Sequence, residues 1–91
     1  MTEERYRIVV SDDAEKQLRK LDKPVQKRVM LAIGRLEEDP RPAGAKKLKA
    51  RENRWRIRVG DRRVVYEIED DRLVVLVIAI GHRSDVYRAK R

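Results

Sequence analysis

The sequence predicts an α+β fold: an N-terminal strand, an antiparallel helical hairpin, and a three-stranded antiparallel meander that completes a four-stranded sheet with the helices packed on one face. Three observations predict it. Strand-like apolar segments occur near the start of the chain and after residue 53, and two stripes at helical spacing lie between them. A length of 91 residues with 41% apolar content suffices for one modest core. We therefore expect a single domain over residues 1–91.

The first half of the chain carries one strand signal and two helix signals. Tyr6–Val10 alternates apolar side chains at period two, which predicts a strand. Asp12, with Glu15 three residues later, predicts the capped start of a short helix. A second helix is expected from near Asp22, with Pro24 in its first turn, and it ends before Pro40. The apolar stripes consist of Ala14, Leu18 and Leu21 in the first helix and of Val25, Val29, Ala32 or Ile33, and Leu36 in the second.

The second half predicts a loop followed by three strands. Residues 39–53 combine Pro, Gly and Lys without periodicity, so we expect an ordered but mobile basic loop there. The last strand is apolar on both faces, which predicts a central position covered by helices on one side. A polar tail, residues 81–88, follows it. The strands are expected at 54–59, 62–69 and 72–80, separated by Gly60-Asp61 in a type II′ turn and by Asp70-Asp71.

Charge is concentrated in one segment. Residues 41–63 contain ten basic and two acidic residues, and 10 − 2 equals the +8 of the whole chain. A field this concentrated favours a polyanionic partner. The absence of cysteine excludes thiol catalysis and fits the reducing cytoplasm. The longest apolar run, 73–80, is too short to span a bilayer, and no signal-like segment is present, so no membrane association is expected. No metal-ligand spacing and no Gly-rich phosphate loop occur, so neither a metal nor a cofactor is expected.

The predicted hairpin turn fixes a register that brings arginines together. Counting outward from Gly60-Asp61, Arg58 faces Arg63 and Arg56 faces Val65, while Trp55, Ile57, Val64 and Tyr66 share the opposite, core face. Like charges directly opposite on a sheet are destabilising by up to about 1 kcal/mol. Folding alone does not explain why these arginines face each other. A phosphate bound between their guanidinium groups would explain it. A merely solvated strand face is the alternative.

The predicted tail adds further candidates. Arg83 and Tyr87 follow the central strand closely enough to fold back over the arginine face. Tyr87 is suited to stacking on a nucleobase, or to proton transfer if surrounding positive charge lowers its pKa from about 10; a terminal packing anchor is the alternative. His82 carries the only imidazole of the chain and is a candidate for proton transfer. A structural or incidental placement of this residue is the alternative.

Motifs along nearly the whole chain resemble the RelE branch of the RelE/ParE superfamily of type II toxins. The resemblance implies a ribosome-dependent endoribonuclease that cleaves mRNA without a metal, through attack of a ribose 2′-hydroxyl on the adjacent phosphate. It also implies silencing by a cognate antitoxin and contacts with ribosomal RNA through the basic loop. The motifs are Pro40-Arg-Pro, Lys46-Lys-Leu-Lys49, Trp55-Arg-Ile-Arg-Val-Gly-Asp61, Arg63-Val-Val-Tyr-Glu-Ile68 and Gly81-His-Arg-Ser-Asp-Val-Tyr87.

The resemblance implies roles for single residues. Arg56 and Arg58 stand where the best-known members have lysines, one of them a proposed general base; because arginine has a pKa above about 12, charge stabilisation is expected instead. Arg63 matches the arginine that stabilises the scissile phosphate, Arg83 the one near the leaving oxygen, and Tyr87 the aromatic that stacks on or activates the substrate. The proton acceptor is then Tyr87 first and His82 second. The expected RNA-binding residues are Lys46, Lys47, Lys49, Arg51, Arg54 and Arg62, the last at a position where relatives often have tyrosine.

Two other functions fit the same sequence. One is a ParE-like toxin that inhibits DNA gyrase and is not a nuclease. The other is a non-toxic nucleic-acid-binding module, for which net charge and the basic loop suffice. For an antitoxin, which we expect to be acidic where it crosses the arginine face, the second helix offers apolar surface around Val25, Met30 and Ala32; plain solvent exposure of these residues is the alternative.

Overall fold

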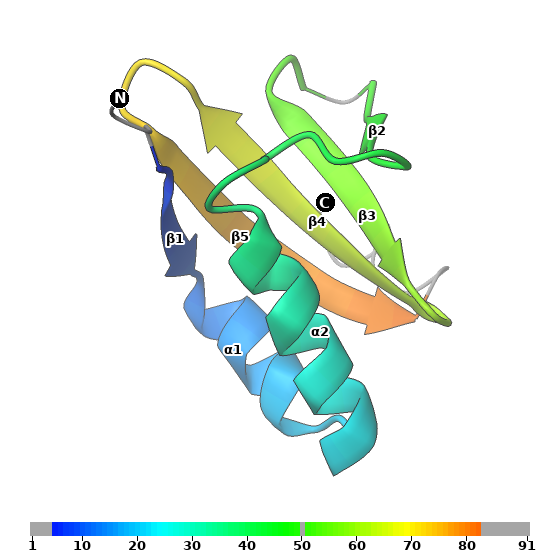
Figure 1. Cartoon of the computed structure of the whole chain (residues 1–91). Coiled ribbons are helices and arrows are strands. Elements are labelled where there is room, and N and C mark those ends of the chain that lie inside the picture. The colour runs from blue at the N-terminus through cyan, green and yellow to red at the C-terminus, as the bar shows by residue number, and fades with distance from the viewer. Residues whose placement is uncertain (1–4, 50, 83–91) are drawn as a thin grey trace.

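The computed structural model describes residues 5–49 and 51–82, and it confirms the α+β class. Two helices pack on one face of a mixed sheet with the strand order β1-β5-β4-β3-β2 (Figure 1). The strand count differs from the prediction, because the sheet has five strands and not four. The elements are β1 (Arg7–Val10), α1 (Asp12–Arg19), α2 (Lys23–Arg35), β2 (Lys46–Lys47), β3 (Arg54–Val59), β4 (Arg62–Glu69) and β5 (Val74–His82).

The additional strand, β2, lies inside the segment predicted as a loop. Lys46 and Lys47 pair antiparallel with Arg56 and Trp55 of β3, and the Leu48 amide donates to the Arg54 carbonyl at 2.8 Å. Two residues are too few to produce an apolar alternation, and this pairing rests on main-chain hydrogen bonds. Sequence periodicity therefore had no signal for it. The basic segment forms an edge of the sheet.

Although the middle strand of the five is β4, the strand β5 is interior to the sheet, with a neighbour on each side. It pairs with β1 in parallel and with β4 antiparallel. It runs over 74–82 where 72–80 was predicted, because residues 70–73 form the turn, with Leu73 at a positive φ of 53°. Gly81 and His82, expected in a polar tail, pair with Arg63 and Arg62 and belong to the sheet.

One predicted helix cap is wrong. Ser11, and not Asp12, is the N-cap of α1: its backbone is extended, and its hydroxyl accepts from the Ala14 amide at 3.1 Å. Asp12 is the first helical residue, where its negative charge suits the helix dipole. The second helix has Pro24 in its first turn as predicted. Neither described helix is long and apolar enough to cross a membrane.

The two faces of the sheet differ. Between the helices and the sheet lies the main core, which includes Ile57, Val64 and Tyr66 with Trp55 at its margin, so the predicted core face of the hairpin is confirmed. The opposite face carries a small second apolar cluster around Val65, Ile78 and Ala79. In Figure 1 the side of the sheet that ends in β2 extends past the helices. The hairpin β3–β4 thus packs on the core through one face and leaves its basic face outside the helical layer.

Candidate functional site

The arginine face of the β3–β4 hairpin is formed as the register predicted. We use this name for Arg56, Arg58 and Arg63 together. Arg58 lies directly opposite Arg63, and Arg56 opposite Val65. The turn holds the register: Gly60 has a φ of 61°, and Asp61 is not among the described residues with positive φ, which is the type II′ pattern. The three side chains therefore share the face that points away from the helices.

Burial makes two of these arginines unusual. Arg56 is only 9% exposed and Arg63 only 8%. None of the ion pairs found among the described residues includes any arginine of this face. The Nε atom of Arg56 is buried without a hydrogen-bond partner. Because a buried charge is costly unless it is paired, this arrangement favours an external anion as the missing partner.

A hollow lies at the hairpin tip, next to the end of β5. It has a volume of about 390 Å³ and is lined by Arg58, Arg63 and His82 together with the turn residues. His82 enters from the end of β5, where it pairs with Arg62. His82 therefore shares the strand face of Arg62, and it also lines a second hollow, on the helix-facing side, with Gln17 and Lys20 of α1. The other predicted members of this cluster, Arg83 and Tyr87, lie outside the described residues.

A second hollow, of about 400 Å³, lies between α2 and the edge of the sheet. Arg56 and Arg58 line it, with Lys46 from β2 and Arg35 from the last turn of α2. Lys46 is brought here by its pairing with Arg56. Sequence reasoning missed Arg35, because a cation in the last turn of a helix is already accounted for by the helix dipole.

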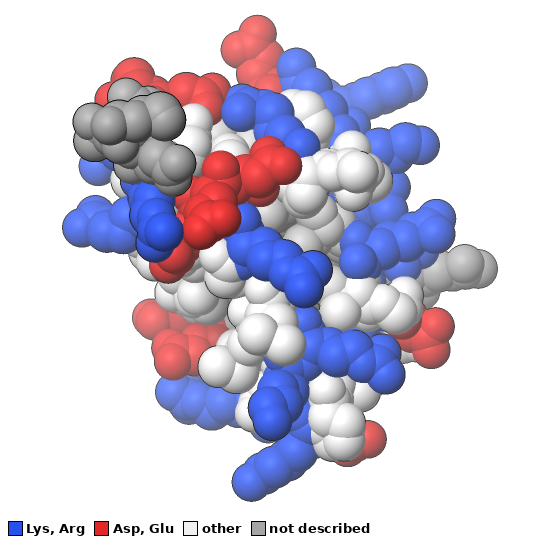
Figure 2. All heavy atoms as spheres, in the orientation of Figure 1, with Lys and Arg blue, Asp and Glu red and all other residues white. Residues whose placement is uncertain are grey.

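The remaining predicted RNA-binding residues are not all placed alike. Lys47, Lys49 and Arg51 are exposed and line a hollow of about 330 Å³ at the β2 edge; Figure 2 shows Lys and Arg side chains gathered on that side of the molecule. Arg62 points to the helix-facing side of the hairpin, next to His82. Arg54 is instead bound to Glu67 in an ion pair of 2.6 Å. The described residues contain no group of three acidic or histidine side chains able to hold a metal ion.

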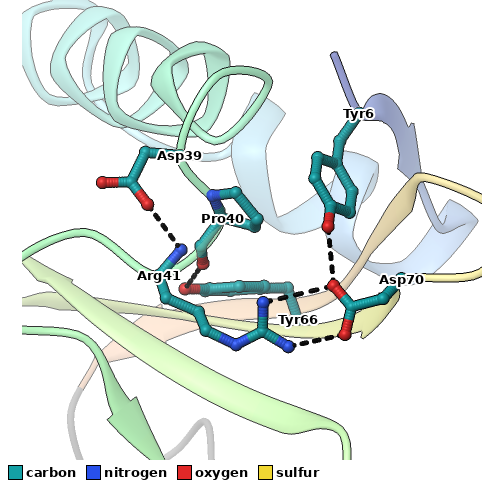
Figure 3. Close-up of polar contacts among 6 residues, drawn as sticks. All are labelled: Tyr6, Asp39, Pro40, Arg41, Tyr66 and Asp70. Atoms are coloured by element: carbon teal, nitrogen blue, oxygen red, sulfur yellow. Dashed lines mark hydrogen bonds and ion pairs between the residues drawn. The ribbon is translucent and has the colours of Figure 1, made fainter. Parts of the chain in front are cut away.

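A polar network that sequence reasoning missed fixes the start of the basic segment (Figure 3). Arg41 donates to both carboxylate oxygens of Asp70, at 3.2 and 2.8 Å, and its guanidinium lies 5.2 Å from the ring centroid of Trp55. The Tyr6 hydroxyl donates to the same carboxylate at 2.6 Å. The Tyr66 hydroxyl donates to the Pro40 carbonyl at 2.7 Å. These contacts tie the segment that leads to Lys46 onto the sheet.

The network also shifts pKa values. The hydrogen bonds from Arg41 and then from Tyr6 lower the pKa of Asp70. The hydrogen bond to Asp70 raises the pKa of Tyr6. Burial raises the pKa of Tyr66 to about 12, so its hydroxyl remains a donor at neutral pH. The network is therefore held in one protonation state under physiological conditions.

The fold and the arginine face define a small α+β protein with a basic surface on one face of its sheet. Comparison with known proteins identifies its class. The model of the family described as the ParE toxin of the type II toxin-antitoxin system parDE matches residues 8–87. A RelE-like toxin protein of Escherichia coli is 33% identical over 87 residues, which cover 91% of this chain and 90% of the relative. The toxin RelG of Mycobacterium tuberculosis is 27% identical over 84 residues, with coverage of 91% and 97%.

Solved structures show the same fold. The isolated RelE toxin of Escherichia coli superposes with a TM-score of 0.75 at 30% identity, over 92% of this chain and 93% of that one. RelE in the archaeal RelE–RelB complex from Pyrococcus horikoshii superposes with a TM-score of 0.77 at 26% identity, over 86% and 94%. The chain belongs to the RelE/ParE superfamily of type II toxins, as the resemblance implied.

Proposed function

We propose that this toxin is an endoribonuclease of the RelE type, which cleaves mRNA in the ribosome and thereby stops translation in the cytoplasm. The observation that carries the proposal is the arginine face: Arg56 and Arg63 are about nine-tenths buried as whole residues and have no acidic partner among the described residues. A phosphodiester supplies the anion that this face lacks, and arginine matches its oxygens with a planar fork.

The proposed reaction is attack of a ribose 2′-hydroxyl on its own 3′-phosphate. The new O–P bond closes a 2′,3′-cyclic phosphate, and the bond to the 5′-oxygen of the next nucleotide breaks, which leaves a 5′-hydroxyl. Negative charge grows on the nonbridging oxygens, where Arg56, Arg58 and Arg63 stabilise it. This stabilisation needs no metal. Arg83 neutralises the leaving oxygen in this scheme.

The isolated protein has few side chains suited to proton transfer. Tyr87 is the first candidate for accepting the 2′-hydroxyl proton, and His82 the second. His82 gains support from its position in the hollow with Arg58 and Arg63. With a single imidazole in the chain, much of the rate enhancement must come from a scaffold that holds the mRNA in line, which is the role assigned to the ribosome.

A cognate antitoxin is the second proposed partner. Several neighbours are complexes of RelE with RelB, including the one from Pyrococcus horikoshii. On this chain, Met30 and Leu31 of α2 are 54% and 61% exposed and offer apolar contacts beside the basic surface. An amphipathic antitoxin segment with acidic side chains would cover both the apolar and the cationic groups.

The decisive experiment adds the purified toxin to a reconstituted translation system programmed with a defined mRNA. We expect cuts at particular codon positions within translated mRNA, mapped by primer extension, whereas the same RNA without ribosomes stays intact. The cognate antitoxin should abolish the cuts. Intact mRNA in the translation system would contradict the proposal.

The same preparation tests the gyrase alternative, which the match to the ParE family model favours. A gyrase inhibitor would block supercoiling of relaxed plasmid and leave translated mRNA uncut. Binding of RNA without either effect would instead identify a nucleic-acid-binding module.

A further inference from the structure

The outer face of the hairpin consists of three rows of paired residues. Arg54 lies opposite Glu67, Arg56 opposite Val65, and Arg58 opposite Arg63. Glu67 is the only acidic residue at these six positions. It stands one row from Arg56, the guanidinium whose Nε has no partner.

Arg54 holds Glu67 firmly. Its Nη2 and Nε atoms donate to Oε2 of Glu67 at 2.6 and 3.1 Å. The two side chains are only 14% and 16% exposed, so water screens this pair much less than a surface pair. A charge-assisted contact of this geometry is among the stronger hydrogen-bonded pairs in proteins.

Glu67 is also within reach of Arg56. Diagonal neighbours on an antiparallel pair have Cα atoms roughly 7–8 Å apart, a gap that long side chains bridge. Two arginines thus compete for one carboxylate, and Arg54 binds it. If Arg54 were neutral, Glu67 would be left half-buried without a partner, and pairing with Arg56 would be its nearest remedy.

We infer that Arg54 is a positioning residue: it holds Glu67 away from Arg56, so that the Arg56 guanidinium stays available to the phosphate. The inference rests on the proposed function for the identity of that phosphate. It differs from a direct contact between Arg54 and RNA, because here the action of Arg54 passes through Glu67. It also explains why an acidic residue is compatible with this face.

A double substitution distinguishes a direct contact between Arg54 and RNA from an action of Arg54 through Glu67. R54Q should lower the cleavage rate in the translation system by about tenfold to a hundredfold, somewhat less than the loss of a full oxyanion donor. E67Q alone should leave the rate within about threefold of wild type. R54Q/E67Q should return the rate to that same range, because no carboxylate remains to neutralise Arg56. A double variant as slow as R54Q would overturn the inference and identify Arg54 as a direct contact.

A binding measurement makes the outcome independent of cleavage. For a short single-stranded RNA oligonucleotide, the slope of log affinity against log salt concentration becomes shallower by about 0.7 for each phosphate that the protein no longer neutralises. The slope should become shallower in R54Q and recover in R54Q/E67Q. If no variant, wild type included, cleaves mRNA but this recovery is seen, the proposed function fails and the positioning role stands. Cleavage by wild type without recovery in the double variant defeats the positioning role alone.

A conservative substitution, R54K, is the control for effects on folding. R54K keeps a cation beside Glu67 and should retain both cleavage and the salt slope, even though the paired geometry is poorer. Denaturant midpoints of all four variants, followed by circular dichroism, show whether each is folded under assay conditions. A folded R54K as impaired as R54Q would contradict a role that depends on holding the Glu67 charge.

Discussion

An exposed arginine in one region of this molecule is paired with a carboxylate, whereas two buried arginines in another region are not. Arg41, in the segment after α2, is exposed, yet it binds both oxygens of Asp70 and lies over Trp55. Arg56 and Arg63, on the hairpin, are nine-tenths buried and take part in no ion pair among the described residues. Stability alone would favour the reverse, because an unpaired charge costs most where water is excluded.

The difference separates a cation that holds the fold, Arg41, from cations to which the proposed function assigns a phosphate as partner. The Arg41 network fixes the segment that carries Lys46 to the sheet, and its groups satisfy one another (Figure 3). On the arginine face, by contrast, Nε of Arg56 is buried without a hydrogen-bond partner, and the proposed function supplies a phosphate to this face. Substitutions in either group of cations test this contrast.

The largest effect is expected for R63A. Loss of a preorganised donor to the phosphate should lower the cleavage rate roughly 10²- to 10³-fold, measured by primer extension in the translation system. R7A is the matched control: Arg7 is exposed on the same face of the sheet, but on β1, next to Val74 at the far end of β5. Equal activity of R63A and R7A would show that the arginine face is not the reaction site.

R56M should raise the stability of the protein and lower its cleavage rate. Methionine retains much of the apolar stem and removes the buried charge. Replacing a buried ion pair with apolar residues of similar volume is often neutral or stabilising by about 1–4 kcal/mol, and Arg56 has no ion-pair partner among the described residues whose attraction would be lost. The denaturant midpoint should rise while cleavage falls. A lower midpoint would mean that the Arg56 guanidinium is already satisfied within the folded chain.

The smallest effect is a pH dependence at Asp70. Its pKa is lowered in the folded chain, mainly by the hydrogen bonds from Arg41, so its contribution to stability is complete above the unfolded value of about 3.9 and is lost as pH falls through the folded value. D70N should be less stable than wild type at pH 7, by less than about 1 kcal/mol because the site is exposed. The difference between the two stabilities, measured from unfolding curves, should shrink as the pH falls below the unfolded pKa of about 3.9, because Asp70 becomes protonated in both states. A constant difference across this range would remove Asp70 ionisation as the cause.

The register of the hairpin was predictable from the sequence because residues close together in the chain determine it. Gly60-Asp61 sets the turn, and counting outward gives every pair from Val59 and Arg62 to Trp55 and Tyr66, as observed. The same count, extended by one pair, places Arg54 opposite Glu67. The ion pair that changes the expected role of Arg54 was therefore readable from the sequence.

The Arg41 network and strand β2 were not predictable in this way. Tyr6 and Asp70 are 64 positions apart, and Arg41 and Asp70 are 29 apart, so no periodicity or spacing links them. Strand β2 has two residues and no apolar alternation. Arg28 was missed for a similar reason: it reaches the hairpin tip from α2, where a Cβ added at Gly60 would lie 3.5 Å from its Nη1. Such contacts depend on how the layers meet in three dimensions.

The parallel pairing of β1 with β5 has a consequence for the order of folding. Arg7 pairs with Val74, so the first described strand has no neighbour in the sheet until the ribosome has synthesised the last one. Contacts of such long sequence separation slow folding, because the chain loses closure entropy before they form. During its own synthesis, the nascent toxin therefore lacks the completed sheet on which its arginines are arrayed.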